Sequence, residues 1–172
     1  MADTTNKIAM RPESEVYMNL GTYNAPVWAR CGDGWKKFDE NPNAQTESSQ
    51  YINAASETID TVSYSPQYSV EMDLMYTDPT IKRVYDVANG RKIGSDAVLD
   101  FLFVDRFIPG TAEGSYAARR ENLAVAISNK GGTKKMVMSG NLNAQGDPVY
   151  GDFTPAAKAE AGQSAGTFTP AA

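Results

Sequence analysis

The sequence predicts a mainly β fold, an antiparallel β-sandwich or barrel-like domain that is flanked by one α-helix. Two segments with strand patterns and one with a helical pattern carry this prediction. From Tyr68 to Tyr76 every second residue is apolar, as in a strand with one buried face. Residues 96–108 carry β-forming side chains on both faces, as in a strand that is covered on both sides. Residues 78–89, between these segments, repeat apolar side chains at helical spacing.

The chain begins with a polar segment that leads into the first strands. Residues 1–14 have no periodicity, which predicts a flexible N-terminal arm. Residues 15–30 predict a strand pair or one bent strand, broken at "NAP". The following "CGDGW" predicts a turn in which Gly32 and Gly34 can adopt a positive φ. We expect one ordinary domain over residues 15–150.

A long polar stretch follows, over residues 38–59, and its composition predicts a loop. A loop of this length in a compact domain has a function or is disordered. Tyr51 and Ile52 form an apolar pair in its middle. Two interpretations stay open for this pair, packing back on the core or docking on a partner.

The helix over residues 78–89 has recognisable ends. Asp78 is expected to accept hydrogen bonds from the free N–H groups of the first turn, and Pro79 fits a position that needs no donor. Asn89 and Gly90 tolerate a left-handed C-cap. One apolar stripe is predicted to pack on the neighbouring sheet, formed by Ile81, Val84, Tyr85 and Ala88.

Three more segments have strand patterns. Residues 96–108 place apolar side chains on both faces, with Leu99, Phe101, Phe103 and Phe107 on one and Val98, Leu102 and Val104 on the other. Residues 116–128 and 133–143 are joined by "NKGG", which predicts a β-hairpin.

The last part of the chain, residues 151–172, is rich in alanine. It contains "FTPAA" twice, at 153–157 and 168–172, and has Phe153 and Phe168 as its only large apolar side chains. This composition predicts a flexible C-terminal tail, mobile or ordered by a partner.

The sequence lacks the residues of most catalytic and cofactor sites. It contains no histidine and a single cysteine, Cys31, so neither a His-based site nor a zinc site of paired cysteines is expected. No phosphate-binding or dinucleotide-binding glycine motif is present. We expect no enzyme activity, no cofactor and no metal. Glu71 and Asp73 share one strand face, which leaves open a carboxylate-pair hydrolase, although two such acids are ordinarily a solvated face.

The charge of the chain argues against sequence-specific nucleic-acid binding. The formal net charge is −5, from 16 Lys and Arg against 21 Asp and Glu. Phosphate neutralisation requires a basic face. The sequence has no run of apolar residues long enough to span a membrane and no signal-peptide pattern at its N-terminus. We therefore expect the chain to be made and assembled in a cytoplasm, with no membrane partner.

A family resemblance rests on "TESSQYINAASETIDTVSYSPQYSVEMDLMYTDPTIKRVYDVANGRKIG". "QYIN" follows "WKKFDE", the tyrosine–proline strand "VSYSPQYSVEMDLMYTDP" runs into an Asp-Pro helix start, and "VYDVANGRKIGSDAVLDFLFVDRF" continues into the next strand. These motifs are moderately specific in combination. Over residues 15–150 the chain resembles the major tail, or tail tube, proteins of long-tailed bacteriophages that infect Gram-positive bacteria.

The resemblance implies a non-enzymatic β-sandwich with one helix, which forms hexameric rings that stack into a tube for DNA ejection. The implied partners are further copies of the chain, tape-measure, terminator and distal tail proteins, and viral DNA that passes without specific binding. The implied location is the virion tail. On this basis Phe38, Tyr51 and Ile52 are candidates for ring stacking, and Glu71 and Asp73 are candidates for the lumen, where acidic side chains repel phosphate.

One alternative stays open at this stage. A different virion module, such as a capsid decoration or head–tail joining protein, can share the same fold.

Overall fold

The computed structural model describes residues 8–157 and 163–172. One 3₁₀ turn precedes the first strand and another follows the helix. The elements in chain order are η1 (Arg11–Glu13), β1 (Ser14–Asn19), β2 (Trp28–Arg30), β3 (Trp35–Asn41), β4 (Ala44–Ser49), β5 (Thr58–Tyr64), β6 (Gln67–Asp73), α1 (Pro79–Asn89), η2 (Gly94–Ala97), β7 (Val98–Pro109), β8 (Tyr116–Gly131), β9 (Val137–Pro155) and β10 (Gly166–Pro170).

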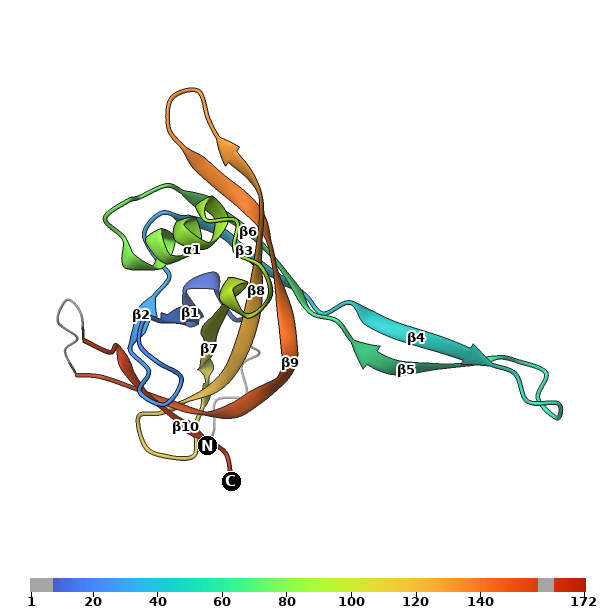
Figure 1. The fold of residues 1–172 in the computed structure, drawn as a ribbon. Helices are drawn as coiled ribbons and strands as arrows, with labels where there is room; N and C mark the ends of the chain where they lie inside the picture. Colours follow the sequence, from blue (N-terminus) through green and yellow to red (C-terminus); the bar gives the residue numbers. More distant parts are fainter. Residues whose placement is uncertain (1–7, 158–162) are drawn as a thin grey trace.

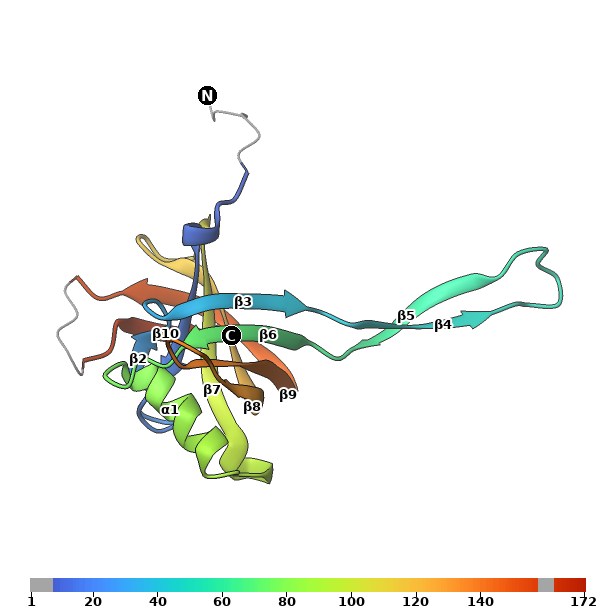
Figure 2. The ribbon, with the colours of Figure 1, turned by 90° about the horizontal axis from the view of Figure 1, so that it is seen from above.

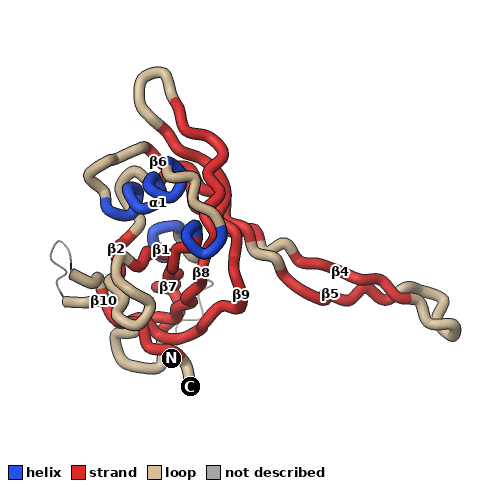
Figure 3. The backbone as a smooth tube through the Cα atoms, viewed as in Figure 1, coloured by secondary structure: helices blue, strands red, loops and turns tan. Residues whose placement is uncertain are grey.

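The body of the molecule is one curled antiparallel sheet (Figure 1). Its strand order is β2-β1-β7-β8-β9-β6-β3, and β10 pairs with β9 beside this path. The mainly β fold with a single α-helix is therefore confirmed. The two layers expected of a sandwich are the two sides of one curled sheet, which has the shape of a half-barrel (Figures 1 and 3).

The curl depends on β9, whose two halves have different neighbours. Residues 137–143 pair with β6, whereas residues 151–155 pair with β10. β8 runs beside both halves, with register shifts after Arg120 and Ile127. A long strand that changes partner along its length bends the sheet, because bulges increase the local twist.

The main core lies between the sheet and α1. Val70 and Met72 of β6 are buried, as the alternating pattern predicts, and Leu99 and Phe101 of β7 lie in the same cluster. On the other side of β7, Leu102 and Val104 belong to a second cluster. The prediction that this strand is covered on both faces is therefore confirmed.

The helix matches its predicted position. The Asp78 carboxylate accepts hydrogen bonds from the backbone N–H groups of Thr80 (2.8 Å) and Ile81 (3.1 Å). Of the predicted stripe, Ile81 and Val84 are buried, while Tyr85 and Ala88 are partly buried. Val87, which the stripe did not include, is also buried.

The left-handed residue after the helix is Arg91, and not the predicted Asn89 or Gly90. Gly90 has a right-handed conformation with φ −75°, whereas Arg91 has φ +47°. The helix therefore ends at Asn89, and the left-handed residue follows two positions later.

Residues 38–59 do not form a loop. Residues 38–41 complete β3, and β4 and β5 pair as a two-stranded sheet that projects from the body (Figures 1 and 2). The loop prediction failed because a hairpin that is exposed on both faces needs no buried apolar positions, so it leaves no alternating pattern in the sequence.

The C-terminal segment is not a tail. Phe153 lies in β9 and is buried, and Phe168 lies opposite it in β10. The two "FTPAA" copies thus meet only at their phenylalanines, because Thr169 and Pro170 pair with Asp152 and Gly151. Both phenylalanines contribute to the second cluster, which also contains Tyr17 and Trp28. Residues 158–162 of this segment, like residues 1–7 of the expected N-terminal arm, lie outside the described residues.

The segment before β10 also contacts the edge strand β2. The Trp28 N–H donates to the Ser164 hydroxyl (3.1 Å), and the Ala165 N–H donates to the Trp28 carbonyl (2.8 Å). These bonds join β2, the last strand on one side of the strand order, to the segment that leads into β10.

Candidate assembly surfaces

The β4–β5 hairpin is the most exposed element of the molecule. Every residue of both strands is exposed. Large apolar side chains are among them, namely Ile59, Val62 and Tyr64, and the tip carries Tyr51 and Ile52. Tyr51 is 66% exposed and Ile52 is fully exposed, so this pair does not pack back on the core.

The two faces of the hairpin differ in chemistry. Glu47 lies directly opposite Asp60, and Ser48 lies opposite Ile59. Because successive side chains of a strand point to opposite faces, the two carboxylates share one face, whereas Ile59 and Tyr64 lie on the other. The hairpin therefore has an acidic face and an apolar face.

Phe38, the third candidate for ring stacking, lies in the core. It is buried, and its ring packs against Tyr68, Phe101 and Phe103 at centroid distances of 5.8, 5.9 and 5.7 Å. A side chain in this position is not available to another subunit, and the prediction is corrected. The polar neighbours of Phe38 in sequence hid its role as the single inward residue of β3.

Glu71 and Asp73, the lumen candidates, lie on the polar side of β6 beside lysines. Lys36 Nζ is 2.6 Å from Asp73 and 3.8 Å from Glu71, and Lys135 Nζ is 2.8 Å from Asp73. Hydrogen bonds from Lys135 and Lys36 lower the pKa of Asp73. The carboxylate of Asp73 is thus largely neutralised by its neighbours, and nothing in this arrangement resembles a pair of carboxylates facing a substrate.

A groove at the surface of the body has two basic residues, Arg91 and Lys130, in its lining. It lies between the end of α1 and the end of β8, and its lining includes Asn89, Arg91, Ile127 and Lys130. Lys130 Nζ donates to the Asn89 side chain (2.9 Å) and lies 4.9 Å from the Tyr85 ring centroid. These two contacts hold the end of the helix against the strand.

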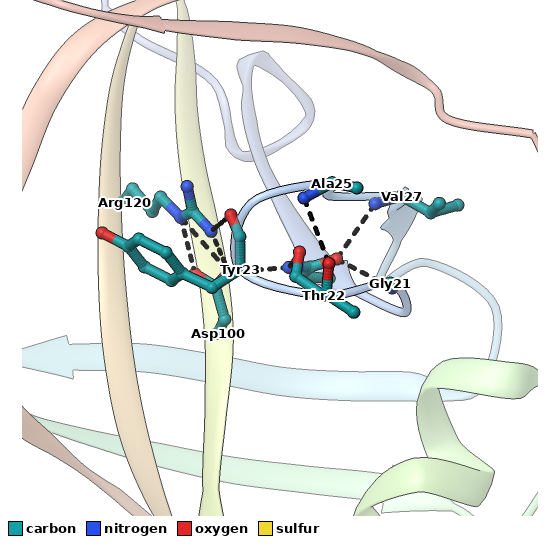
Figure 4. A network of polar contacts seen from close by, with 8 residues as sticks. Gly21, Thr22, Tyr23, Ala25, Val27, Asp100 and Arg120 are labelled. Atoms are coloured by element: carbon teal, nitrogen blue, oxygen red, sulfur yellow. Dashed lines mark hydrogen bonds and ion pairs between the residues drawn. The ribbon is translucent and has the colours of Figure 1, made fainter.

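Partly buried ion pairs, which no local pattern in the sequence indicates, stabilise the body. Arg120 is bonded to Asp100 at 2.6 Å, donates to the Tyr23 carbonyl, and lies 3.9 Å from the Tyr23 ring centroid (Figure 4). Asn19 donates to the same carboxylate at 2.8 Å and accepts from the Gly21 N–H. This network fixes the loop between β1 and β2.

A second network surrounds Glu15. Arg30 and Arg106 both pair with its buried carboxylate, at 3.1 and 2.9 Å, and the Tyr17 hydroxyl donates to it at 2.6 Å. Burial, followed by the hydrogen bond to Glu15, raises the pKa of Tyr17. No buried side-chain nitrogen or oxygen of these four residues lacks a hydrogen-bond partner, as a buried polar network requires.

The described residues contain no group of three or more His, Cys, Asp or Glu side chains that could hold a metal ion. Burial raises the pKa of the Cys31 thiol, which disfavours the reactive thiolate. None of the helices in the described ranges is long and apolar enough to cross a membrane.

No protein-family model and no curated protein matches this chain. Among solved structures, a chain of the anti-feeding prophage (AFP) baseplate, determined by cryo-EM with six-fold symmetry, superposes with a TM-score of 0.48 and 8% sequence identity. The alignment covers 85% of this chain and 97% of that chain. A similarity of this strength assigns neither a family nor a function.

Proposed function

We propose that this chain is a structural subunit of a bacteriophage tail tube, which assembles with copies of itself into stacked hexameric rings that conduct DNA out of the head. The observation that carries this proposal is the projecting β4–β5 hairpin. A two-stranded hairpin is marginally stable on its own in water. A hairpin that also exposes Tyr51, Ile52 and Ile59 gains burial and rigidity by contact with a partner.

The edges of the sheet support the same function. The strand order ends in β2 on one side and β3 on the other. Trp28 of β2 already bonds to Ser164 and Ala165 of the same chain, so β3 is the more open edge. An unpaired edge invites pairing with another chain. In a closed ring of identical subunits such edges meet neighbours of fixed orientation, which leaves no edge free.

The charge suits a passage for DNA. Six copies of a chain with net charge −5 carry about −30. An acidic bore repels phosphate, so DNA does not adhere during transit. Glu71 and Asp73 remain the lumen candidates, and Glu71 supplies more of the unpaired charge because Lys36 and Lys135 both contact Asp73.

In this function the chain has no catalytic role and needs no cofactor. Its partners are other copies of itself and the tape-measure, terminator and distal tail proteins, and its place is the virion tail after assembly in the host cytoplasm. DNA passes without sequence-specific contact.

Negative-stain electron microscopy of the purified chain over a range of concentrations tests this function. We expect rings or tubes for the wild-type chain and loss of stacking for Tyr51→Ser. Tyr76→Ser is the matched control, because Tyr76 is 69% exposed and Tyr51 is 66% exposed, and Tyr76 lies outside the hairpin. A chain that stays monomeric alone and binds only to capsids would instead be a decoration or head–tail joining module.

A further inference from the structure

The acidic face of the β4–β5 hairpin lacks a cation. Glu47 and Asp60 lie directly opposite each other across the strand pair. Like charges in this position destabilise a hairpin. The sequence contains no Lys or Arg between residues 38 and 81, and no described residue forms an ion pair with either carboxylate. The hairpin would therefore be stabilised by a basic surface supplied from outside.

The body provides a basic surface at the end that contains α1 and the β8–β9 turn. Residues 82–96 and 130–135 together contain seven Lys and Arg against two Asp. The groove between α1 and β8 lies within this region, and Arg91 and Lys130 line it. We call the groove itself, with Arg91 and Lys130 in its lining, the basic groove.

Apolar side chains accompany the charges on both surfaces. Ile93, two residues after Arg91, is 84% exposed, and Met136 in the β8–β9 turn is also exposed. On the hairpin, Ile52 at the tip is exposed, whereas Ile59 lies on the face opposite to the two carboxylates. An interface with both charge pairing and apolar burial is more specific than either alone.

The hairpin cannot reach the basic groove of its own chain. In two views at right angles, the hairpin extends away from α1 (Figures 1 and 2). A contact between these two surfaces therefore joins two copies, each offering a different surface. Such a head-to-tail contact repeats indefinitely or closes into a ring.

We infer that the acidic face of the β4–β5 hairpin of one copy binds the basic groove of a second copy. This contact presupposes the self-assembly proposed above and identifies the surface that receives the hairpin. Glu47 and Asp60 face Arg91 and Lys130 of the other copy, whereas Ile59, on the opposite face of the hairpin, lies outside this contact. Salt screens such pairs, so assembly weakens as ionic strength rises.

Two charge-reversed variants of the full chain test the contact. One carries Glu47→Lys and Asp60→Lys, and the other carries Arg91→Asp and Lys130→Glu. Aspartate suits the left-handed backbone at position 91. We expect each variant alone to need at least about a tenfold higher concentration for assembly in sedimentation velocity, because like charges then meet. Arg83→Glu, on the exposed side of α1 and outside the groove lining, is the control and assembles like the wild type.

Mixing the two variants is the decisive measurement. A basic hairpin then meets an acidic groove and an acidic hairpin meets a basic groove, so alternating assemblies form at the wild-type concentration. If each variant weakens assembly and the mixture does not restore it, the hairpin binds another surface. Unchanged assembly of the hairpin variant would overturn the contact outright.

Two further results separate this contact from the proposed function. A wild-type chain that does not self-associate under any condition contradicts the function itself. Assembly that is lost in Tyr51→Ser but unaffected by charge reversal supports the function and contradicts the contact. If circular dichroism shows that a reversed variant is unfolded, the neutral pairs Glu47→Gln with Asp60→Asn and Arg91→Asn with Lys130→Gln replace it, with a smaller loss of assembly expected for each.

Discussion

The Tyr68 hydroxyl donates a 2.7 Å hydrogen bond to the Glu121 carboxylate, across 53 residues of sequence. Both side chains are buried, and Arg119 pairs with the same carboxylate at 2.7 Å. Burial, followed by this hydrogen bond, raises the pKa of Tyr68. The contact ties β6 to β8, although β9 lies between them in the sheet.

Tyr68→Phe is expected to lower the free energy of unfolding by about 1–3 kcal/mol, because it leaves a buried carboxylate short of one donor. Urea unfolding monitored by circular dichroism measures the change. Tyr64→Phe, at an exposed position of the hairpin, is the control and should unfold like the wild type. Equal stability of both variants would show that the hydroxyl of Tyr68 contributes nothing.

Gly34→Ala should destabilise the fold by about 2 kcal/mol. Gly34 has φ +84°, which an L-residue adopts at a cost, and an added Cβ would lie 2.6 Å from the Cδ1 atom of Ile81. At Gly32, in the same turn, an added Cβ meets nothing within 4 Å, so Gly32→Ala should have little effect. Thermal melts of the two variants test this difference, and a lower melting temperature for Gly32→Ala would contradict it.

Lys135→Ala should raise the pKa of Asp73 toward its ordinary value, because the hydrogen bond from Lys135 is the largest cause of its lowered pKa. A depressed folded-state pKa means that the ion pair stabilises the fold above the unfolded-state pKa. This contribution disappears as the pH falls through the folded-state pKa. NMR titration of the Asp73 carboxyl carbon measures the pKa, and Lys134→Ala, which removes the neighbouring lysine, should leave it unchanged.

Phe168→Ala should lower the free energy of unfolding by about 1–3 kcal/mol, because it uncovers the buried ring of Phe153 and weakens the second cluster. Guanidinium unfolding measures the loss. Phe107→Ala is a suitable comparison, since Phe107 is 45% exposed and lies outside both clusters. If the two variants lose equal stability, β10 does not cover the core as described.

The parts of the fold that the sequence predicts well are those with local patterns. The alternation through Val70 and Met72 and the stripe of Ile81 and Val84 are signals of burial within one element, and the burial follows. The hairpin predicted at "NKGG" is equally local, and it forms between β8 and β9. Its turn lies further along the chain, at residues 132–136, because residues 129–131 extend β8.

The parts that the sequence predicts poorly depend on distant partners. Phe153 and Phe168 read as isolated residues in an alanine-rich stretch, because nothing local shows that they meet across a strand pair. The buried partners of Glu15 come from β2 and β7, so its charge reads as an exposed one. The acidic face of the hairpin and the basic groove also have no local signal in the sequence. The first depends on the pairing of β4 with β5, and the second depends on the packing of α1 beside β8.

The hydrogen bonds from Ser164 and Ala165 to Trp28 have a consequence for biosynthesis. Trp28 and Ser164 are 136 residues apart in sequence. A nascent chain cannot join these positions until synthesis has passed residue 165, and folds dominated by such distant pairings form slowly. The part of the half-barrel that contains Trp28 therefore closes only after residues 164 and 165 have been synthesised.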